Sequence, residues 1–204
     1  MARRGQLPAT KRRIPRQARA AETVALILEA TAQILEAGGL AAFTTNAVAE
    51  RAGVSIGTLY QYFGNKNAIL LALAQREMEA TLAKVARAGE AERSLGMEGR
   101  VRATVRAIIE AFGGRVRARK AVVQAILAQG TGIEVMAPVA AFIAQQPQRL
   151  MPALTAEQLF VLSRSLMATI RAAVLEEQPF LRSRGFEDEV VRMITAYLSS
   201  IIET

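Results

Sequence analysis

The segment from residue 44 to residue 66 has residue types and spacings that suit DNA binding; it reads TTNAVAERAGVSIGTLYQYFGNK. Thr44 or Thr45 can cap a helix, because a threonine oxygen accepts a backbone N–H two or three residues later. Gly53 can end that helix, since glycine enters the left-handed region without a steric cost. Ser55 can then cap a second helix. The pattern predicts two short helices joined by a tight turn.

The second helix divides into an inward and an outward face. Leu59 and Phe63 are four residues apart, so they share the face that points inward. Asn65 can cap a third helix that opens with Lys66. Two adjacent helices around a short glycine-containing turn are typical of a DNA-reading helix-turn-helix. The outward or groove-flanking positions are Ile56, Gly57, Thr58, Tyr60, Gln61 and Tyr62.

The rest of the chain has helical periodicity and no convincing strand alternation, which predicts an all-α fold. A first helix is expected from about Glu22 to Ala37, ended by Gly38 and Gly39. Its apolar stripe would support the motif. After a long helix from Lys66 to about Ala88 and a loop over 89–99, further helices are expected at 99–112, 115–129, 133–145, 155–177 and 187–203.

Composition excludes most enzymatic and metal sites. The chain has no Cys and no His, so thiolate and imidazole chemistry lack their residues. Carboxylates that are adjacent in sequence, such as Glu176 and Glu177, diverge around a helix and do not pair. We therefore predict no catalytic residues, no metal site, no cofactor and no enzyme activity.

The net charge of +8 is concentrated at the start of the chain. Residues 1–19 hold seven basic residues and no acid, which leaves +1 for the remainder. This predicts an arm that attracts DNA phosphate or enters the minor groove, with Arg12, Arg13 and Arg16 as candidate contacts; the alternative is a charged, disordered leader. No continuous apolar run of about 18 residues and no secretory signal are evident, which predicts a cytoplasmic protein without a membrane partner.

Over residues 22–72 the sequence resembles the tetracycline-repressor (TetR) family of bacterial regulators. Asn67 departs from the family, which usually has an acidic residue there. That difference weakens a favourable helix-dipole contact only. The matching residues are Gly39, Phe43, Thr44-Thr45, Val48-Ala49, Ala52 to Ser55, Gly57 to Tyr60, Tyr62-Phe63, Lys66 and Ile69 to Leu71.

The resemblance implies a homodimeric repressor that binds a double-stranded DNA operator and is released by a small-molecule effector. It implies an arm over 1–19, a three-helix DNA-binding domain over 20–66, and a helical effector-binding and dimerisation domain over 67–204. The alternative is a DNA-binding regulator or architectural factor controlled by a protein partner or by no ligand. Base contacts would come from Asn46, Ile56, Gly57 and Tyr60, and phosphate contacts from Thr45, Ser55, Thr58, Tyr62 and Lys66.

Three sets of residues in the second domain have two interpretations each. Phe112, Met136, Phe142, Phe160 and Met167 could line an apolar effector pocket or be plain core. The basic cluster of Arg115, Arg117, Arg119 and Lys120 could attract an anionic ligand or form a solvated helix face. The apolar stripes Leu159, Leu162, Leu166, Thr169, Ile170 and Leu175, and Val190, Ile194, Tyr197, Leu198 and Ile201, could form a four-helix bundle between two subunits or be core.

Overall fold

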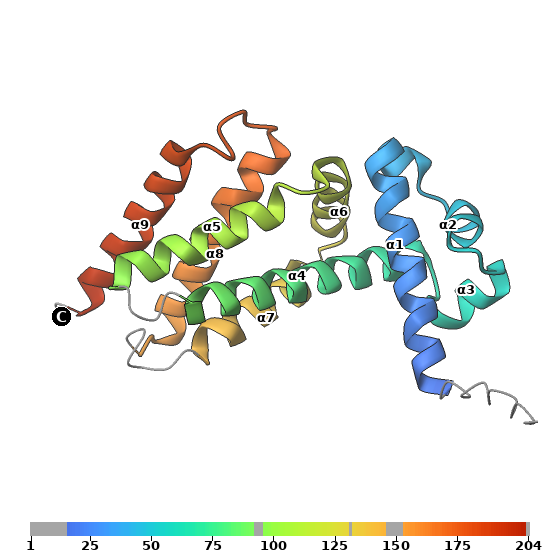
Figure 1. Cartoon of the computed structure of the whole chain (residues 1–204), viewed down its shortest axis with the longest axis horizontal. Helices are drawn as coiled ribbons and strands as arrows, with labels where there is room; N and C mark the ends of the chain where they lie inside the picture. Colours follow the sequence, from blue (N-terminus) through green and yellow to red (C-terminus); the bar gives the residue numbers. More distant parts are fainter. Residues whose placement is uncertain (1–15, 92–95, 131, 146–152, 203–204) are drawn as a thin grey trace, which may run out of the picture.

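The computed structural model describes residues 16–91, 96–130, 132–145 and 153–202, and every regular element in these ranges is an α-helix. The all-α prediction is therefore confirmed for the part of the chain that is described. The helices are α1 Arg16–Ala42, α2 Thr45–Ala52, α3 Ile56–Tyr62, α4 Lys66–Ala91, α5 Met97–Phe112, α6 Val116–Gln129, α7 Gly132–Ala144, α8 Ala156–Leu175 and α9 Arg184–Ile202 (Figure 1).

Helix α1 is longer than the sequence predicted. It begins at Arg16 and not near Glu22, so the last residues of the expected 1–19 arm are helical. Gly39 breaks the helix as expected, with φ of 63° and ψ of −159°, and the chain then continues helically to Ala42. Two of the three arm residues singled out above, Arg12 and Arg13, lie outside the described residues.

The buried side chains form two hydrophobic clusters. One, the C-terminal cluster, joins α4, α5, α7, α8 and α9 around residues such as Ile170 and Val105. The other, the N-terminal cluster, joins α1 to α4 around Ile27, Leu35 and Leu59, and it also includes α6. Figure 1 shows α6 between the two halves of the molecule, beside α1. The side chains of α6 that belong to the N-terminal cluster are mostly small: Ala118, Ala121, Val122, Ala125 and Ile126.

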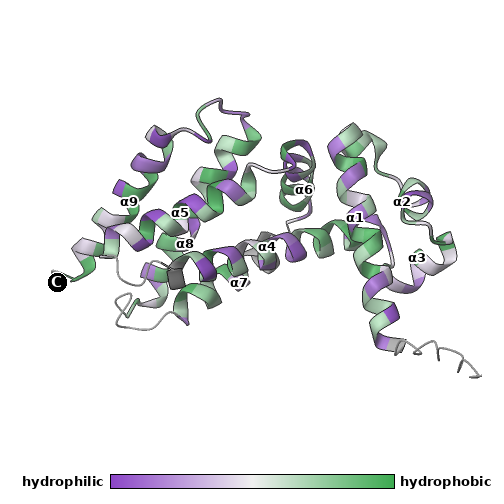
Figure 2. Ribbon diagram, viewed as in Figure 1, coloured by the Kyte–Doolittle hydropathy of each residue, from purple (hydrophilic) through white to green (hydrophobic). Residues whose placement is uncertain are grey.

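Helix α4 connects the two clusters. Its first half places Ile69, Leu70 and Leu73 in the N-terminal cluster. Its second half places Met78 and Val85 in the C-terminal cluster. Figure 2 shows apolar residues along this helix interrupted by hydrophilic ones. A movement of one end of α4 would therefore be felt in both cores, because packed interiors transmit strain.

The apolar stripes predicted on the last two helices are core residues of the single chain in part, since five of their eleven members are half-buried: Leu159, Thr169, Leu175, Tyr197 and Ile201. Leu162, Leu166 and Ile170 of α8 are buried in the C-terminal cluster, as are Val190, Ile194 and Leu198 of α9. Both helices also keep a few large apolar side chains exposed, among polar residues such as Asp188, Glu189 and Arg192 on α9. The large apolar side chains exposed on these two helices are Phe160, Val161, Met193 and Ile202.

Two helices are long and apolar enough, by length and composition alone, to cross a membrane. They are Gln17–Ala42 of α1 and Ala156–Leu175, which is α8. Neither is a continuous apolar run, since Glu29 and Glu36 interrupt α1 and Arg164 interrupts α8. Both also supply core residues, Ile27 from α1 and Ile170 from α8, and core helices of soluble proteins pass the same test.

Candidate functional site

Helix α2 begins and ends through the residues that the sequence indicated. The N–H of Ala47 donates to Thr44 Oγ1 at 3.1 Å, so Thr44, and not Thr45, is the N-cap. Gly53 adopts φ of 68° and ψ of 30°, and its N–H reaches the carbonyls of Ala49 and Glu50. A residue with a Cβ would be strained in this left-handed conformation. The tight turn between the two helices therefore depends on Gly53.

Side-chain caps also set the starts of α3 and α4. The N–H of Thr58 donates to Ser55 Oγ at 3.0 Å, and the two hydroxyl oxygens are 2.8 Å apart. At the start of α4, the N–H of Ala68 donates to Asn65 Oδ1 at 2.9 Å. Both predicted caps are present. The local sequence therefore fixes where the second and third helices of the motif begin.

Helix α3 buries one side and exposes the other. Leu59 is fully buried and Phe63, just beyond the helix, is nearly so. Ile56 is 40% exposed, although it is a large apolar residue, and Tyr60 is 50% exposed. Of the nine residues proposed to contact DNA, Thr45 and Thr58 are half-buried and the others are exposed: Asn46, Ser55, Ile56, Gly57, Tyr60, Tyr62 and Lys66.

The structure links the two helices of the motif through this surface. The hydroxyl oxygens of Thr45 on α2 and Tyr60 on α3 are 3.3 Å apart, within hydrogen-bond distance. Tyr60 is thus oriented by a residue from the neighbouring helix. No contact within the described chain requires glycine at position 57, because an added Cβ would meet only Ser55 Oγ, at 3.8 Å.

Two acidic residues of α1, Glu29 and Glu36, point to α6. Arg115 donates to Glu29 Oε1 at 2.6 Å, and this hydrogen bond is the main cause of the lowered pKa of Glu29. The N–H of Ala118, in the first turn of α6, donates to Glu36 Oε2 at 2.9 Å. A carboxylate at a helix N-terminus is stabilised by the helix dipole. Sequence reasoning missed this α1–α6 joint, because its partners are more than 80 residues apart.

The basic cluster on α6 is exposed at Arg115 and Arg117 and half-buried at Arg119 and Lys120. Besides Arg115, Arg117 Nη1 lies 3.4 Å from the carbonyl oxygen of Ala37, and Lys120 pairs with Glu177. Arg119 forms an ion pair with Glu77 of α4. Each cation of the cluster has a partner within the chain, and the prediction of a solvated face holds for the exposed Arg115 and Arg117 and fails for Arg119, which is 15% exposed.

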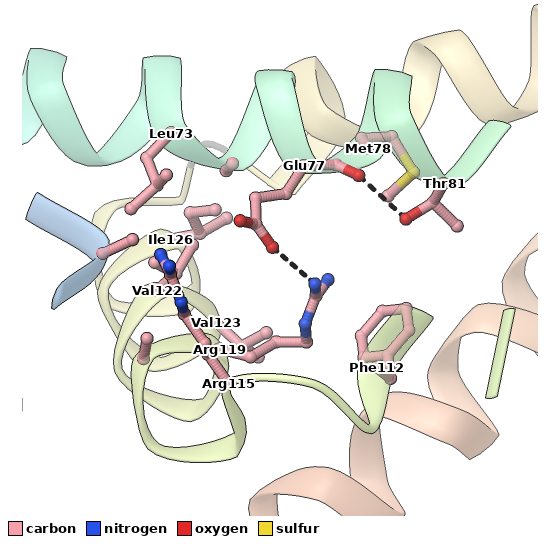
Figure 3. A pocket seen from close by; sticks show the side chains of 13 residues that line it. Leu73, Glu77, Met78, Thr81, Phe112, Arg115, Arg119, Val122, Val123 and Ile126 are labelled. Carbon is pink, nitrogen blue, oxygen red and sulfur yellow. Dashed lines mark hydrogen bonds and ion pairs between the residues drawn. The ribbon is translucent and has the colours of Figure 1, made fainter. Parts of the chain in front are cut away.

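A cavity of about 60 Å³ lies where α1, α4, α5 and α6 meet, at the junction of the two hydrophobic clusters (Figure 3). Glu77, Arg115 and Arg119 are its charged residues. The remaining lining is Thr81 with the apolar residues Ala32, Leu73, Ala74, Met78, Phe112, Ala118, Val122, Val123 and Ile126. This volume holds about two water molecules and is far below the roughly 300 Å³ or more of an ordinary ligand site.

Of the four predicted pocket residues whose side chains the structure describes, one lines this cavity. Phe112 does so, whereas Met167 is buried in the C-terminal cluster and Phe142 packs against that cluster. Phe160 is 61% exposed, so its assignment to an enclosed pocket is wrong. The side chain of Met136 lies outside the described residues. The sequence missed the cavity because alanines and charged residues make up half of its lining.

Arg119 is the least solvated cation of the cavity. Its side chain is 15% exposed, and its guanidinium carbon lies 4.9 Å from the centre of the Phe112 ring. Burial lowers the pKa of Arg119, and the attraction of Glu77 opposes that shift only in part. The Nε atom of Arg119 is buried and has no hydrogen-bond partner among the described residues. Figure 3 shows this guanidinium between Glu77 and Phe112.

Comparison with known proteins decides what the N-terminal motif is. Residues 27–73 match the family model of bacterial regulatory proteins of the tetR family. The chain carries a TetR-family DNA-binding domain. A curated relative, the HTH-type transcriptional repressor KstR of Mycolicibacterium smegmatis, is 48% identical over 62 residues, which are 30% of this chain and 30% of that protein. The match to the relative therefore spans less than a third of its length.

Solved structures extend the likeness of the TetR-type fold to most of the chain. The TetR family repressor AlkX from Dietzia sp. superposes with a TM-score of 0.66 at 18% identity, over 87% of this chain and 95% of that one. The multidrug binding protein EbrR, solved with imidazole, gives a TM-score of 0.63 at 18% identity, over 86% and 94%. At these identities the likeness concerns the fold.

Among the described residues, no group of three or more acidic side chains is placed to hold a metal.

Proposed function

We propose that the chain is a homodimeric, sequence-specific DNA-binding repressor that a small-molecule effector releases from its operator. The observation that carries the proposal is the exposed surface of α3 in a TetR-family motif, with Tyr60 held by Thr45. The curated relatives that match this motif are transcriptional repressors. Asn46, Ile56, Gly57 and Tyr60 would lie at base edges, with the other exposed polar residues at phosphates. The protein would act in the cytoplasm.

The exposed apolar side chains of α8 and α9 support the dimer. Phe160 and Val161 on α8, and Met193 and Ile202 on α9, are large apolar side chains left in solvent by the single chain. A second copy of the chain would cover these side chains, and burial of apolar surface favours association. A helix-turn-helix of this size also needs a second copy that binds a second half-site, about 34 Å away along the duplex, for useful affinity.

Effector release is supported by the position of the cavity more than by its size. It lies between the two clusters and against α4, which runs directly into the DNA-binding domain. EbrR is described as a multidrug binding protein, and AlkX as a repressor implicated in n-alkane degradation. A volume of about 60 Å³ requires the cavity to widen when an effector enters. The same small volume favours the alternative, a regulator controlled by a protein partner.

The direct test is selection of bound DNA from a random pool with the full-length protein, followed by titration of the selected duplex. We expect a sequence with two-fold symmetry, bound by one dimer. Lys66→Ala should weaken binding to all sequences and lower the salt slope by about one unit, because Lys66 would hold one phosphate. Tyr60→Ala should mainly reduce discrimination between operators. Equal loss of discrimination in the two variants would contradict these roles.

Gly57→Ala should have opposite effects on stability and on DNA binding. Alanine in a helix is favoured over glycine by about 0.5–1 kcal/mol, and the structure has room for the methyl group. We therefore expect a higher free energy of unfolding in urea titrations, together with weaker operator binding because the methyl group would meet the DNA. Unchanged operator affinity in this variant would show that Gly57 is not at the interface.

A further inference from the structure

The ion pair at the cavity joins two helices that are not neighbours in the sequence. Glu77 lies on α4, 11 residues after Lys66 starts that helix, and Arg119 lies on α6. Their ion pair ties α4 to α6 beside the cavity (Figure 3). The Thr81 hydroxyl donates to the carbonyl oxygen of Glu77 at 2.8 Å, and it accepts no hydrogen bond from Arg119 Nε.

The guanidinium of Arg119 is only partly used by Glu77. The hydrogen bond to Glu77 Oε2 comes from Nη2, while the neighbouring Nε has no partner among the described residues. Nε and Nη2 lie on the same edge of the group, and together they form the two-pronged donor that a carboxylate accepts with both oxygens. A buried donor left without a partner is costly. The site therefore offers one hydrogen-bond donor of a cation without a partner, beside a carboxylate that accepts from another nitrogen of the same guanidinium.

The third charged residue of the lining adds no hydrogen-bond acceptor for Arg119. Arg115 is a second cation at the cavity, and its guanidinium is paired with Glu29 of α1 outside the lining. The walls that remain are almost wholly apolar, with the face of Phe112 against Arg119. An acceptor that enters here would also need an apolar body to cover these walls.

We propose that the effector site takes a small apolar monocarboxylate, whose carboxylate binds Nε and Nη2 of Arg119 and displaces Glu77. This inference rests on the proposed function, whose effector class it names. The volume of about 60 Å³ suits a carboxylate and its first carbon atoms, and the rest of the apolar body would separate the surrounding helices. Glu77, which is 30% exposed, would turn to solvent. Loss of the ion pair would free α4 from α6, and α4 leads directly to the recognition helix.

The test uses the full-length protein and three probes of equal length: hexanoate, 1-hexanol and hexylammonium. By calorimetry, we expect hexanoate to bind at least about tenfold more tightly than the other two probes, because only its carboxylate can accept hydrogen bonds from both Nε and Nη2 of Arg119. Arg119→Gln should lower the hexanoate affinity by about tenfold or more and leave hexanol unchanged. Glu77→Gln should raise the hexanoate affinity, since it removes the competing carboxylate. A merely structural ion pair would give losses in both variants.

Arg117→Gln is the matched control, because it removes one positive charge from the same helix outside the cavity. It should leave hexanoate binding unchanged. Equal affinities for the three probes, tighter hexylammonium binding to the wild type, or no hexanoate binding at millimolar concentration would each overturn the proposal. If Arg119→Gln does not fold, the probe series and Glu77→Gln decide the question by themselves.

The selected operator duplex separates this inference from the proposed function. Saturating hexanoate should weaken operator binding by the wild-type protein and not by Arg119→Gln. Operator binding that resists hexanoate but is released by another, uncharged ligand would reject the carboxylate and keep the effector-released repressor. Absence of any sequence-specific DNA binding would instead reject the proposed function.

Discussion

Leu59→Ala is expected to lower the free energy of unfolding by about 2–5 kcal/mol, because it leaves a cavity under α3. Leu59 is fully buried and belongs to the N-terminal cluster with Ile27 and Leu35. Total stabilities are about 5–15 kcal/mol, so this change removes a large share. Urea unfolding followed by circular dichroism measures the loss. A loss below about 1 kcal/mol would contradict the packing described here.

Ile56→Ala is the matched control on the same helix. Ile56 is large and apolar like Leu59, yet it is substantially exposed. Its removal should leave stability within about 0.5 kcal/mol, as is usual for surface substitutions. It should nevertheless weaken binding to the selected operator if Ile56 lies at a thymine methyl group, as proposed. The pair separates the folding role of one face of α3 from the DNA-binding role of the other.

Deletion of residues 2–15 is expected to reduce DNA affinity by about ten- to a hundredfold at 150 mM salt. The deletion removes five basic residues and no acid. Each phosphate contact that is lost should lower the slope of log affinity against log salt by about 0.9. The deletion stops at residue 15 because α1 begins at Arg16, and a cut after residue 19 would remove the first turn of that helix.

A full-length variant with the same five basic residues changed to glutamine separates charge from chain length. If phosphate attraction is the cause, this variant should show the same loss of affinity and the same change in salt slope as the deletion. Sedimentation should show the same oligomeric state for both variants and the wild type. Unchanged binding at 150 mM salt would show that the start of the chain does not contact DNA.

The helix-turn-helix could be predicted in detail because its signals are local. The cap at Ser55, the left-handed Gly53 and the inward pair Leu59 and Phe63 each depend on residues within about one helical turn. The structure shows every one of them where the sequence indicated. The choice of Thr44 over Thr45 as the cap was left open, since both hydroxyls have suitable spacing and only the backbone conformation distinguishes them.

Helix boundaries were less predictable, for an energetic reason. The start of α1 was expected near Glu22 because the apolar stripe begins there, but the structure has the helix from Arg16. Residues outside the stripe have no packing that demands a helix, and arginine, alanine and glutamine have high helix propensity. Periodicity reports which residues must be packed, and propensity alone decides how far the helix extends beyond them.

The sequence by itself determined the motif, the all-α class and the concentration of basic charge in the first 19 residues. The tertiary structure alone decided that α6 packs with the DNA-binding end, that Phe160 is exposed, and that Arg119 is buried against Glu77. Glu77 and Arg119 are 42 residues apart, and either could face solvent on an isolated helix. When apolar residues cover more than one face of a helix, the buried face is the one against which other helices pack. Those helices are distant in the sequence, so local patterns do not reveal them.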